Sequence, residues 1–240
     1  MTKKRNLSTV KTVATAMTVL FAMLTALPAL PQEVSSVDVV LEQMAGAYQT
    51  LETLSARLQQ VKSYPQLGLT DPPETGLLYL KRKGGGDLLV RLEIREPEKR
   101  IVTVKDDGRY MLYQPKIKQA IEGRLAPSAG SGSGTSFVSY FLGDLTAAKK
   151  DYDISFVGEE AIGAHRTIHL QLDAKPDGEG YYPRIDLWVD TELWMPVQQE
   201  FVEPNRSVTR IQFEGIQINR EIKDSLFTVE LPPDVERVRG

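Results

Sequence analysis

The chain has 240 residues and a formal net charge of −3, and a chain of this length can bury one substantial hydrophobic core. Its 41% hydrophobic and 25% charged residues are typical of a globular protein, and the negative charge argues against nucleic acid as the main partner. The chain contains no cysteine, which excludes disulfides, thiolate metal sites, a cysteine nucleophile and lipid attachment to an N-terminal cysteine.

Residues 1–29 have the order of a secretory signal peptide. The first residues carry lysine and arginine, residues 13–27 are mostly apolar, and a proline and an alanine follow. The apolar stretch is shorter than the roughly 20 residues that a transmembrane helix usually needs. We therefore expect cleavage after Ala29, a single mature domain over residues 30–240, and export to a bacterial periplasm. The alternative is an uncleaved anchor in the inner membrane.

The mature chain begins with a helical pattern. Ser36 and Asp38 are typical of a helix start, and apolar residues then recur at intervals of three and four. This spacing predicts an amphipathic helix over residues 36–51.

From Thr53 onward, apolar and polar residues alternate, which is the pattern of half-buried strands. After a first strand around 54–59, similar runs recur at 75–82, 87–95, 100–105, 109–114, 152–158, 166–174, 184–190, 195–203 and 207–218. Between the two series lie a loop rich in glycine and serine (127–135) and two short helical segments (136–142 and 145–150). The pattern predicts an α+β fold, with about ten antiparallel strands in one curved sheet and helices covering its concave face.

The sequence contains few of the residues that usually act in catalysis or bind metal ions. The chain has two histidines, His165 and His169. On a strand they would lie about 13 Å apart, which is too far to share a metal ion. No G-x-S-x-G or phosphate-binding loop motif is present. We therefore expect no enzymatic activity, no catalytic residues, no metal and no cofactor.

An ordered series of short motifs resembles the LolA-type outer-membrane lipoprotein carriers and the related RseB/MucB sensor domains. The motifs are YQTLETLSARLQ (48–59), GLLYLKR (76–82), Glu96-Pro97, Asp107-Gly108, Tyr113-Gln-Pro115 with Gln119, IDLWVD (185–190), Trp194-Met-Pro196, and Phe227 before Pro232-Pro233. The resemblance covers nearly all of the mature chain. It implies an unclosed antiparallel β half-barrel of about 10–11 strands with a helical lid.

The resemblance also implies a function. Such carriers take acylated lipoproteins from an ABC lipoprotein-releasing transporter in the inner membrane to a lipoprotein receptor in the outer membrane. Because each buried CH₂ is worth about 0.8 kcal/mol, acyl chains need an apolar cover to cross water. We expect these three partners, no role for nucleic acid, and a monomer. The alternatives are a lipid-sensing envelope-stress regulator of the RseB/MucB type, which usually has a second C-terminal domain, and a carrier of another acylated lipid.

The residues expected to hold the acyl chains are apolar side chains of the inner strand faces and of the lid. The strand candidates are Leu78, Leu80, Leu88, Val90, Leu92, Met111 and Tyr113, and the lid candidates are Val40, Leu41, Met44, Phe137, Tyr140 and Phe141. The alternative is an ordinary filled core, which strand alternation alone does not distinguish from a cavity.

The family also carries an arginine that forms hydrogen bonds to the lid and helps to set its open and closed states. Arg82 matches that position. Because residues 83–86 depart from the family pattern, Arg91 in the next strand competes for this role of lid latch. The alternative for either residue is a solvated surface arginine.

Overall fold

The computed structural model describes residues 36–84, 88–105, 107–124 and 145–239. The helices are α1 (Val37–Gln49) and α3 (Leu145–Ala148), and three short 3-10 turns are η1 (Pro65–Leu67), η2 (Pro115–Ile117) and η3 (Asp224–Phe227). The strands are β1 (Thr53–Tyr64), β2 (Leu69–Thr70), β3 (Glu74–Arg82), β4 (Leu88–Glu96), β5 (Arg100–Val104), β6 (Arg109–Gln114), β7 (Gln119–Arg124), β8 (Tyr152–Ile162), β9 (His165–Ala174), β10 (Arg184–Asp190), β11 (Pro196–Val202), β12 (Val208–Ile218) and β13 (Glu236–Arg239).

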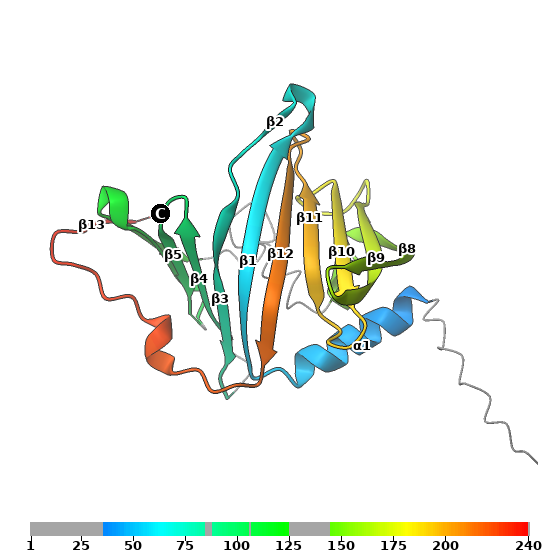
Figure 1. Cartoon of the computed structure of the whole chain (residues 1–240), viewed down its shortest axis with the longest axis horizontal. Coiled ribbons are helices and arrows are strands. Elements are labelled where there is room, and N and C mark those ends of the chain that lie inside the picture. The colour runs from blue at the N-terminus through cyan, green and yellow to red at the C-terminus, as the bar shows by residue number, and fades with distance from the viewer. Residues whose placement is uncertain (1–35, 85–87, 106, 125–144, 240) are drawn as a thin grey trace, which may run out of the picture. The chain divides into compact units, whose positions relative to one another are not determined.

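All the strands belong to one 13-stranded sheet. Its order is β13-β7-β6-β5-β4-β3-β1-β12-β11-β10-β9-β8, and β2 pairs with β1 beside this path. The pairing is antiparallel except between β13 and β7, which are parallel. Because β13 and β8 stand at opposite ends and do not pair with each other, the sheet is unclosed (Figure 1). This confirms the expected large unclosed sheet.

Three strands were missed by the sequence-based prediction. The strand β2 has two residues, and β13 contains one hydrophobic residue among charged ones. The strand β7 has a glycine and only two apolar side chains, Ala120 and Ile121. Such segments lack a clear period of two, so their pairing with neighbouring strands, rather than their own pattern, makes them strands.

The predicted N-terminal helix is confirmed as α1, and its buried residues are Val40, Leu41 and Met44. They belong to the same hydrophobic cluster as strand residues from β1 to β12. Of the two helical segments expected after the glycine-rich loop, residues 136–142 lie outside the described residues and the other is the short α3. Within the described ranges, no helix is long and apolar enough to span a membrane.

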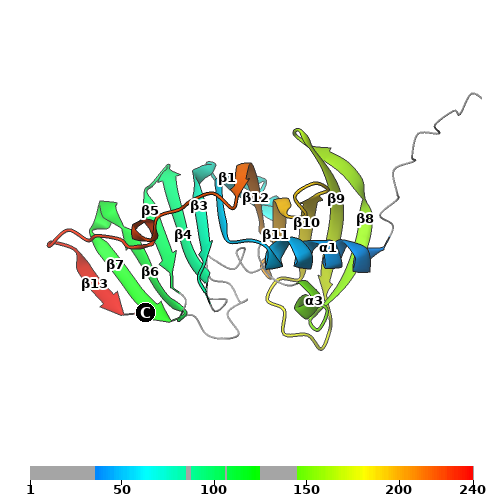
Figure 2. The same ribbon diagram turned by 90° about the horizontal axis from the view of Figure 1, so that it is seen from below.

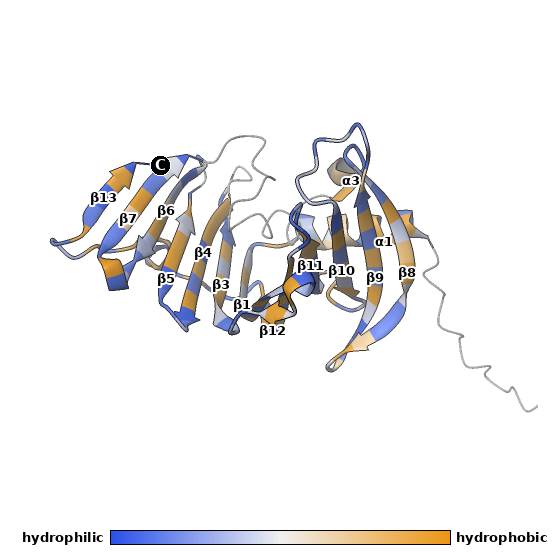
Figure 3. Ribbon diagram, turned by 90° about the horizontal axis from the view of Figure 1, so that it is seen from above, coloured by the Kyte–Doolittle hydropathy of each residue, from blue (hydrophilic) through white to orange (hydrophobic). Residues whose placement is uncertain are grey.

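The sheet curves, and its two faces carry different hydrophobic clusters (Figures 2 and 3). On the concave face, Leu78 and Leu80 of β3 lie opposite Leu92 and Val90 of β4, and the buried side chains of α1 belong to the same cluster. On the convex face, a smaller cluster around Tyr113 packs under residues 222–235, which we call the C-terminal segment. Figure 3 shows hydrophobic and hydrophilic residues alternating along the strands, as this two-faced arrangement requires.

Candidate functional site

A continuous line of apolar side chains crosses the concave face from the core to one end of the sheet. Paired residues of β1, β3, β4, β5, β6, β7 and β13 form this apolar row, which consists of Ala56, Leu78, Leu92, Val102, Leu112, Ile121 and Val238. Side chains that lie directly opposite each other on neighbouring strands are about 5 Å apart. The members of the row therefore touch one another and form one apolar surface.

Burial changes along the apolar row. Leu78 is 0% exposed and Leu92 is 5% exposed. The four remaining members of the row toward β13 are half-buried, namely Val102, Leu112, Ile121 and Val238. Apolar surface on this face therefore extends beyond the filled core. Because half-buried apolar side chains gain free energy when they are covered, this part of the concave face can bind an apolar ligand.

The other half of the concave face is filled. Leu170, Leu187 and Ile211, from β9, β10 and β12, are at most 2% exposed. The helix α1 runs beside these strands (Figures 1 and 2), and its buried side chains belong to their cluster. The half of the concave face formed by β9 to β12 is therefore a filled core, whereas the half near β13 has open apolar surface.

The side chain of Arg82 joins the end of β3 to the end of α1. Its Nε donates a hydrogen bond to the carbonyl oxygen of Leu51, and its Nη2 donates one to that of Tyr48, both at 3.0 Å. The guanidinium also lies 4.3 Å from the centre of the Tyr48 ring. The last carbonyls of a helix lack intrahelical partners and carry partial negative charge, so a cation stabilises this end. Arg82 therefore ties the end of β3 to the end of α1.

Eight of the residues predicted to bind acyl chains come together on the concave face. They are Val40, Leu41 and Met44 of α1, Leu78 and Leu80 of β3, and Leu88, Val90 and Leu92 of β4, all in or packed against one cluster. Phe137, Tyr140 and Phe141 lie outside the described residues.

Met111 and Tyr113 do not line the concave face, contrary to the prediction. In β6 the concave positions are Tyr110 and Leu112, which pair with Val104 and Val102. Tyr113 instead belongs to the convex cluster under the C-terminal segment. Both faces of β6 carry apolar side chains, because the C-terminal segment packs over the convex one, so the sequence pattern of this strand does not reveal which side chains point inward.

Comparison with known proteins supports the fold assignment. A family model described as "Uncharacterized protein" matches residues 92–208, and no curated protein matches the sequence. Among solved structures, MucB has a TM-score of 0.52 at 13% identity, covering 80% of this chain and 62% of that chain. MucB in complex with MucA(peri) has a TM-score of 0.50 at 15% identity, covering 81% and 60%. The chain has the LolA/RseB-like fold.

The LolA/RseB-like fold is also seen in an uncharacterized conserved protein from Thermus thermophilus. That structure has a TM-score of 0.53 and 12% identity, and the match covers 85% of this chain and 98% of that one. The present chain thus spans nearly all of the Thermus protein but only about 60% of the length of the MucB chains. At these identities the comparisons show the fold alone.

The second predicted latch, Arg91, lies on the convex face of the LolA/RseB-like sheet. Its Nη1 donates a hydrogen bond to the carbonyl oxygen of Leu226 at 3.1 Å, and its Nη2 lies 2.9 Å from the carboxylate of Glu93. Since Val90 and Leu92 point to the concave face, Arg91 between them points away from it. Arg91 therefore holds the C-terminal segment and does not reach α1.

The Arg91–Glu93 pair predicts a pH-dependent stability. Burial alone would raise the pKa of Glu93, but the hydrogen bond and charge of Arg91 outweigh it and hold this pKa below its ordinary value. A depressed folded-state pKa contributes stability above the unfolded pKa of about 4.3, and this contribution is lost as the pH falls through the folded value. We expect Glu93→Gln to lower the free energy of unfolding by about 1 kcal/mol at pH 7, and the difference to shrink below about pH 4.

Urea unfolding of both proteins between pH 3 and pH 7 measures this difference. Glu122→Gln is a matched control, because Glu122 pairs at 3.7 Å with Arg237 where both side chains are exposed. The control should change stability by less than about 0.5 kcal/mol. A Glu93→Gln difference that stays constant over this pH range would show that the carboxylate charge does not contribute.

The two histidines lie on the convex face, each beside its own carboxylate. His169 Nε2 is 2.8 Å from Asp186 Oδ1, and the imidazole stacks on Trp188 with ring centres 4.4 Å apart. His165 Nδ1 is 2.6 Å from Asp190 Oδ2. Among the described residues, no group of three metal-ligating side chains is close enough to hold a metal ion. These pairs tie β9 to β10, and the spacing of the histidines in the sequence did not indicate them.

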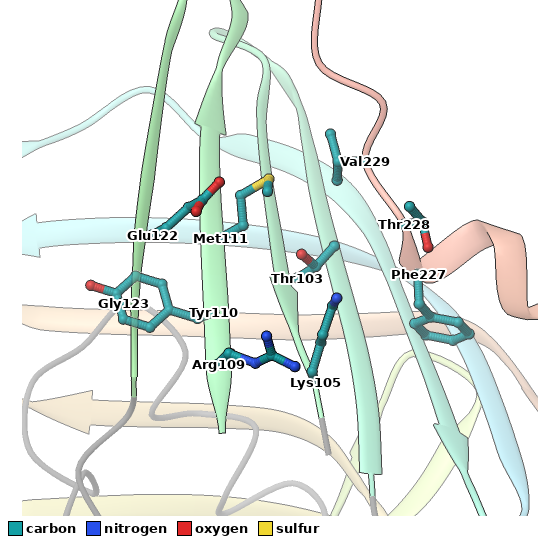
Figure 4. A pocket seen from close by; sticks show the side chains of 10 residues that line it. All are labelled: Thr103, Lys105, Arg109, Tyr110, Met111, Glu122, Gly123, Phe227, Thr228 and Val229. Atoms are coloured by element: carbon teal, nitrogen blue, oxygen red, sulfur yellow. The ribbon is translucent and has the colours of Figure 1, made fainter. Parts of the chain in front are cut away.

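A pocket of about 220 Å³ lies on the convex face beside the C-terminal segment (Figure 4). Figure 4 shows Phe227 and Val229 of this segment facing the strand side chains of Thr103 and Met111. The lining also includes charged lysine, arginine and glutamate side chains. Because unpaired or exposed charge beside a hydrocarbon chain is unfavourable, this pocket suits an acyl chain less well than the apolar row does.

Proposed function

We propose that the protein is a periplasmic carrier that binds the acyl chains of lipoproteins on the concave face and moves them from the inner to the outer membrane. The observation that carries the proposal is the apolar row, which continues half-buried from Val102 to Val238 beyond the filled core. Single exposed apolar side chains are common on folded proteins, whereas a contiguous apolar strip that continues past the core is typical of a ligand or partner site. A ligand with a long apolar chain accounts for the extension.

The dimensions of the apolar row suit such a chain. Neighbouring strands are about 4.8 Å apart, so the half-buried stretch from β5 to β13 spans about 14 Å. One leaflet of a bilayer has a hydrocarbon depth of about 15 Å. A lipoprotein acyl chain laid across these strands would therefore cover the half-buried stretch over nearly its full length.

Release requires that binding be reversible, and α1 with its latch provides a means. The helix buries three side chains against the concave face, and Arg82 fixes its end through two hydrogen bonds. We propose that α1 is the lid, and that its closed position competes with cargo for this face. Each hydrogen bond from a charged group is worth about 1.5–3 kcal/mol, which is small enough to break during loading.

The partners of this proposed carrier are the acylated lipoproteins, the inner-membrane ABC transporter that releases them, and the outer-membrane receptor. Export by the N-terminal signal would place the protein between these two membrane partners. We propose that it acts there as a monomer and catalyses no reaction. A lipid carrier needs no covalent step, because both loading and delivery transfer the same apolar surface from one cover to another.

A second candidate function is that of a regulator that binds a partner protein. MucB, which shares this fold at a TM-score of 0.50, has been solved in complex with MucA(peri). The fold therefore binds a partner protein in that case. For the present chain, a regulator would retain its lipid as a signal, whereas a carrier would pass it on to a receptor.

Release of a lipoprotein from membranes tests the proposal. The mature chain from Leu30 is incubated with inner-membrane vesicles that contain a radiolabelled lipoprotein, its transporter and ATP. We expect label in a soluble one-to-one complex. If no label is released while a known carrier succeeds with the same vesicles, the lipoprotein-carrier function is wrong. Mass spectrometry of lipids extracted from the native protein then distinguishes another acylated lipid from no lipid.

A further inference from the structure

One polar side chain lies in the middle of the apolar concave face. Gln199 of β11 is 0% exposed. Its neighbours along the strand are Val197 and Phe201, and Leu187 and Ile211 lie opposite it on β10 and β12. All four neighbours are at most 2% exposed. The amide is therefore surrounded by hydrocarbon.

Neither the amide nitrogen nor the amide oxygen of Gln199 has a hydrogen-bond partner in the described structure. Burying an amide in this way is costly, because both groups leave water without replacement. Its neighbour Gln198, on the convex face of the same strand, accepts a hydrogen bond from Gln212 at 2.6 Å. Two adjacent glutamines thus differ in whether their amides are paired, and the unpaired one faces the side of the proposed lipid site.

We propose that Gln199 is the polar anchor for an amide group at the head of an acylated ligand. This inference rests on the proposed lipid-binding function and specifies its ligand. A glutamine amide offers N–H donors and a carbonyl acceptor, and a secondary amide offers the complementary carbonyl and N–H. An ester supplies only acceptors. It can accept a hydrogen bond from the N–H of Gln199, but it leaves the side-chain carbonyl of Gln199 without a donor. The site should therefore prefer an N-acyl amide to an ester with the same chain.

The position of Gln199 fits this role. Its neighbours Leu187 and Ile211 belong to the same cluster as the buried side chains of α1, so movement of the proposed lid would uncover part of the cluster that encloses it. From β11 the sheet continues through β12 and β1 to β3, a distance of about 14 Å at the usual strand spacing. Ile211 lies opposite Gln199, and Gln60 of β1 lies opposite Ile211. An acyl chain anchored at Gln199 would therefore pass Ile211 and Gln60 before it met the apolar side chains of Leu58 and Leu78.

Competition binding with matched probes tests the anchor. N-propylhexadecanamide and propyl hexadecanoate each displace a fluorescent fatty acid from the full mature chain, and Kd values are compared between wild type and Gln199→Leu. We expect Gln199→Leu to weaken amide binding about tenfold and ester binding about threefold. The matched control Gln198→Leu should leave both affinities unchanged, because this side chain lies on the opposite face.

Thermal unfolding without ligand gives an independent readout. Removing an unpaired buried amide should raise the Tm of Gln199→Leu by about 3–6 °C. A lower Tm would overturn the proposal, because it would mean that the amide is paired in the folded protein. Equal loss of amide and ester affinity, or no loss of either, would also overturn the anchor while the lipid-binding function stands. Failure of the wild type to bind any probe would instead overturn the proposed function.

Discussion

Replacing Leu112 by glutamate is expected to weaken the binding of an acyl-chain probe by roughly 100-fold. Leu112 lies in the apolar row, between Val102 and Ile121 on the neighbouring strands. A carboxylate there removes apolar contact from the chain and must be desolvated when the ligand binds. Because Leu112 is half-buried rather than fully buried, the free protein can keep the new charge in water and remain folded.

The adjacent residue provides the control. Met111 has a similar degree of burial, but it pairs with Thr103 and Glu122 on the convex face. Met111→Glu should therefore leave acyl affinity within about twofold of wild type. Fluorescence titration with a fatty-acid probe measures both variants, and circular dichroism confirms their folding. Equal loss of affinity in both variants would contradict the assignment of the site to the concave face.

These two variants separate the proposed site from the convex pocket. The pocket is lined by Met111, Lys105 and Phe227, among others, so a ligand bound there would respond to Met111→Glu. The apolar row lies on the opposite face of the same strands. Neighbouring residues of a strand point to opposite faces, so a one-residue change in the mutated position moves the charge from one candidate site to the other.

Much of the fold follows from local patterns that act without help from distant parts of the chain. The alternation in Leu78 and Leu80 and in Val90 and Leu92 identifies two strands and their buried face, because one face of each meets the core. The spacing of Val40, Leu41 and Met44 similarly identifies α1. In these segments a single buried face dictates the pattern, and the sequence-based prediction was confirmed.

Other features depend on contacts between distant segments. Tyr113 is buried because Val229 and Leu231 of the C-terminal segment pack over the convex face, and nothing in β6 itself signals this cover. The strand β13 exists through its parallel pairing with β7. Wherever a second segment buries the outer face of a strand, both of its faces become apolar and alternation no longer marks the inner one.

The polar residues of the candidate site also differ in whether the sequence pattern or only the strand register reveals them. The motif resemblance indicated Arg82, whose hydrogen bonds reach carbonyl oxygens at the end of α1. It also left Arg91 as a competitor, which the strand register assigns to the convex face. Gln199 gave no signal, because adjacent glutamines in a strand look equivalent until the register with Leu187 and Ile211 is known.

Arg82→Leu is expected to tighten the binding of acyl chains while it impairs their delivery. In the proposed carrier, the closed position of α1 competes with cargo for the concave face, and the two hydrogen bonds of Arg82 and its contact with the Tyr48 ring would stabilise this position. Losing these contacts should lower the free energy of unfolding by about 2 kcal/mol. If these contacts stabilise the closed position by the same roughly 2 kcal/mol, their loss removes this competition with the ligand, and acyl affinity rises by up to about 30-fold.

The delivery step distinguishes a latch from a merely structural arginine. A lid that closes less favourably displaces cargo less readily, so transfer of labelled lipoprotein to receptor-containing outer-membrane vesicles should slow as affinity rises. Arg91→Leu is the matched control, because its hydrogen bond to Leu226 and its ion pair with Glu93 lie on the convex face. This control should lose stability without a change in acyl affinity or transfer rate. Normal transfer by Arg82→Leu, or the same binding change in both variants, would exclude Arg82 as the latch and leave α1 a fixed part of the core.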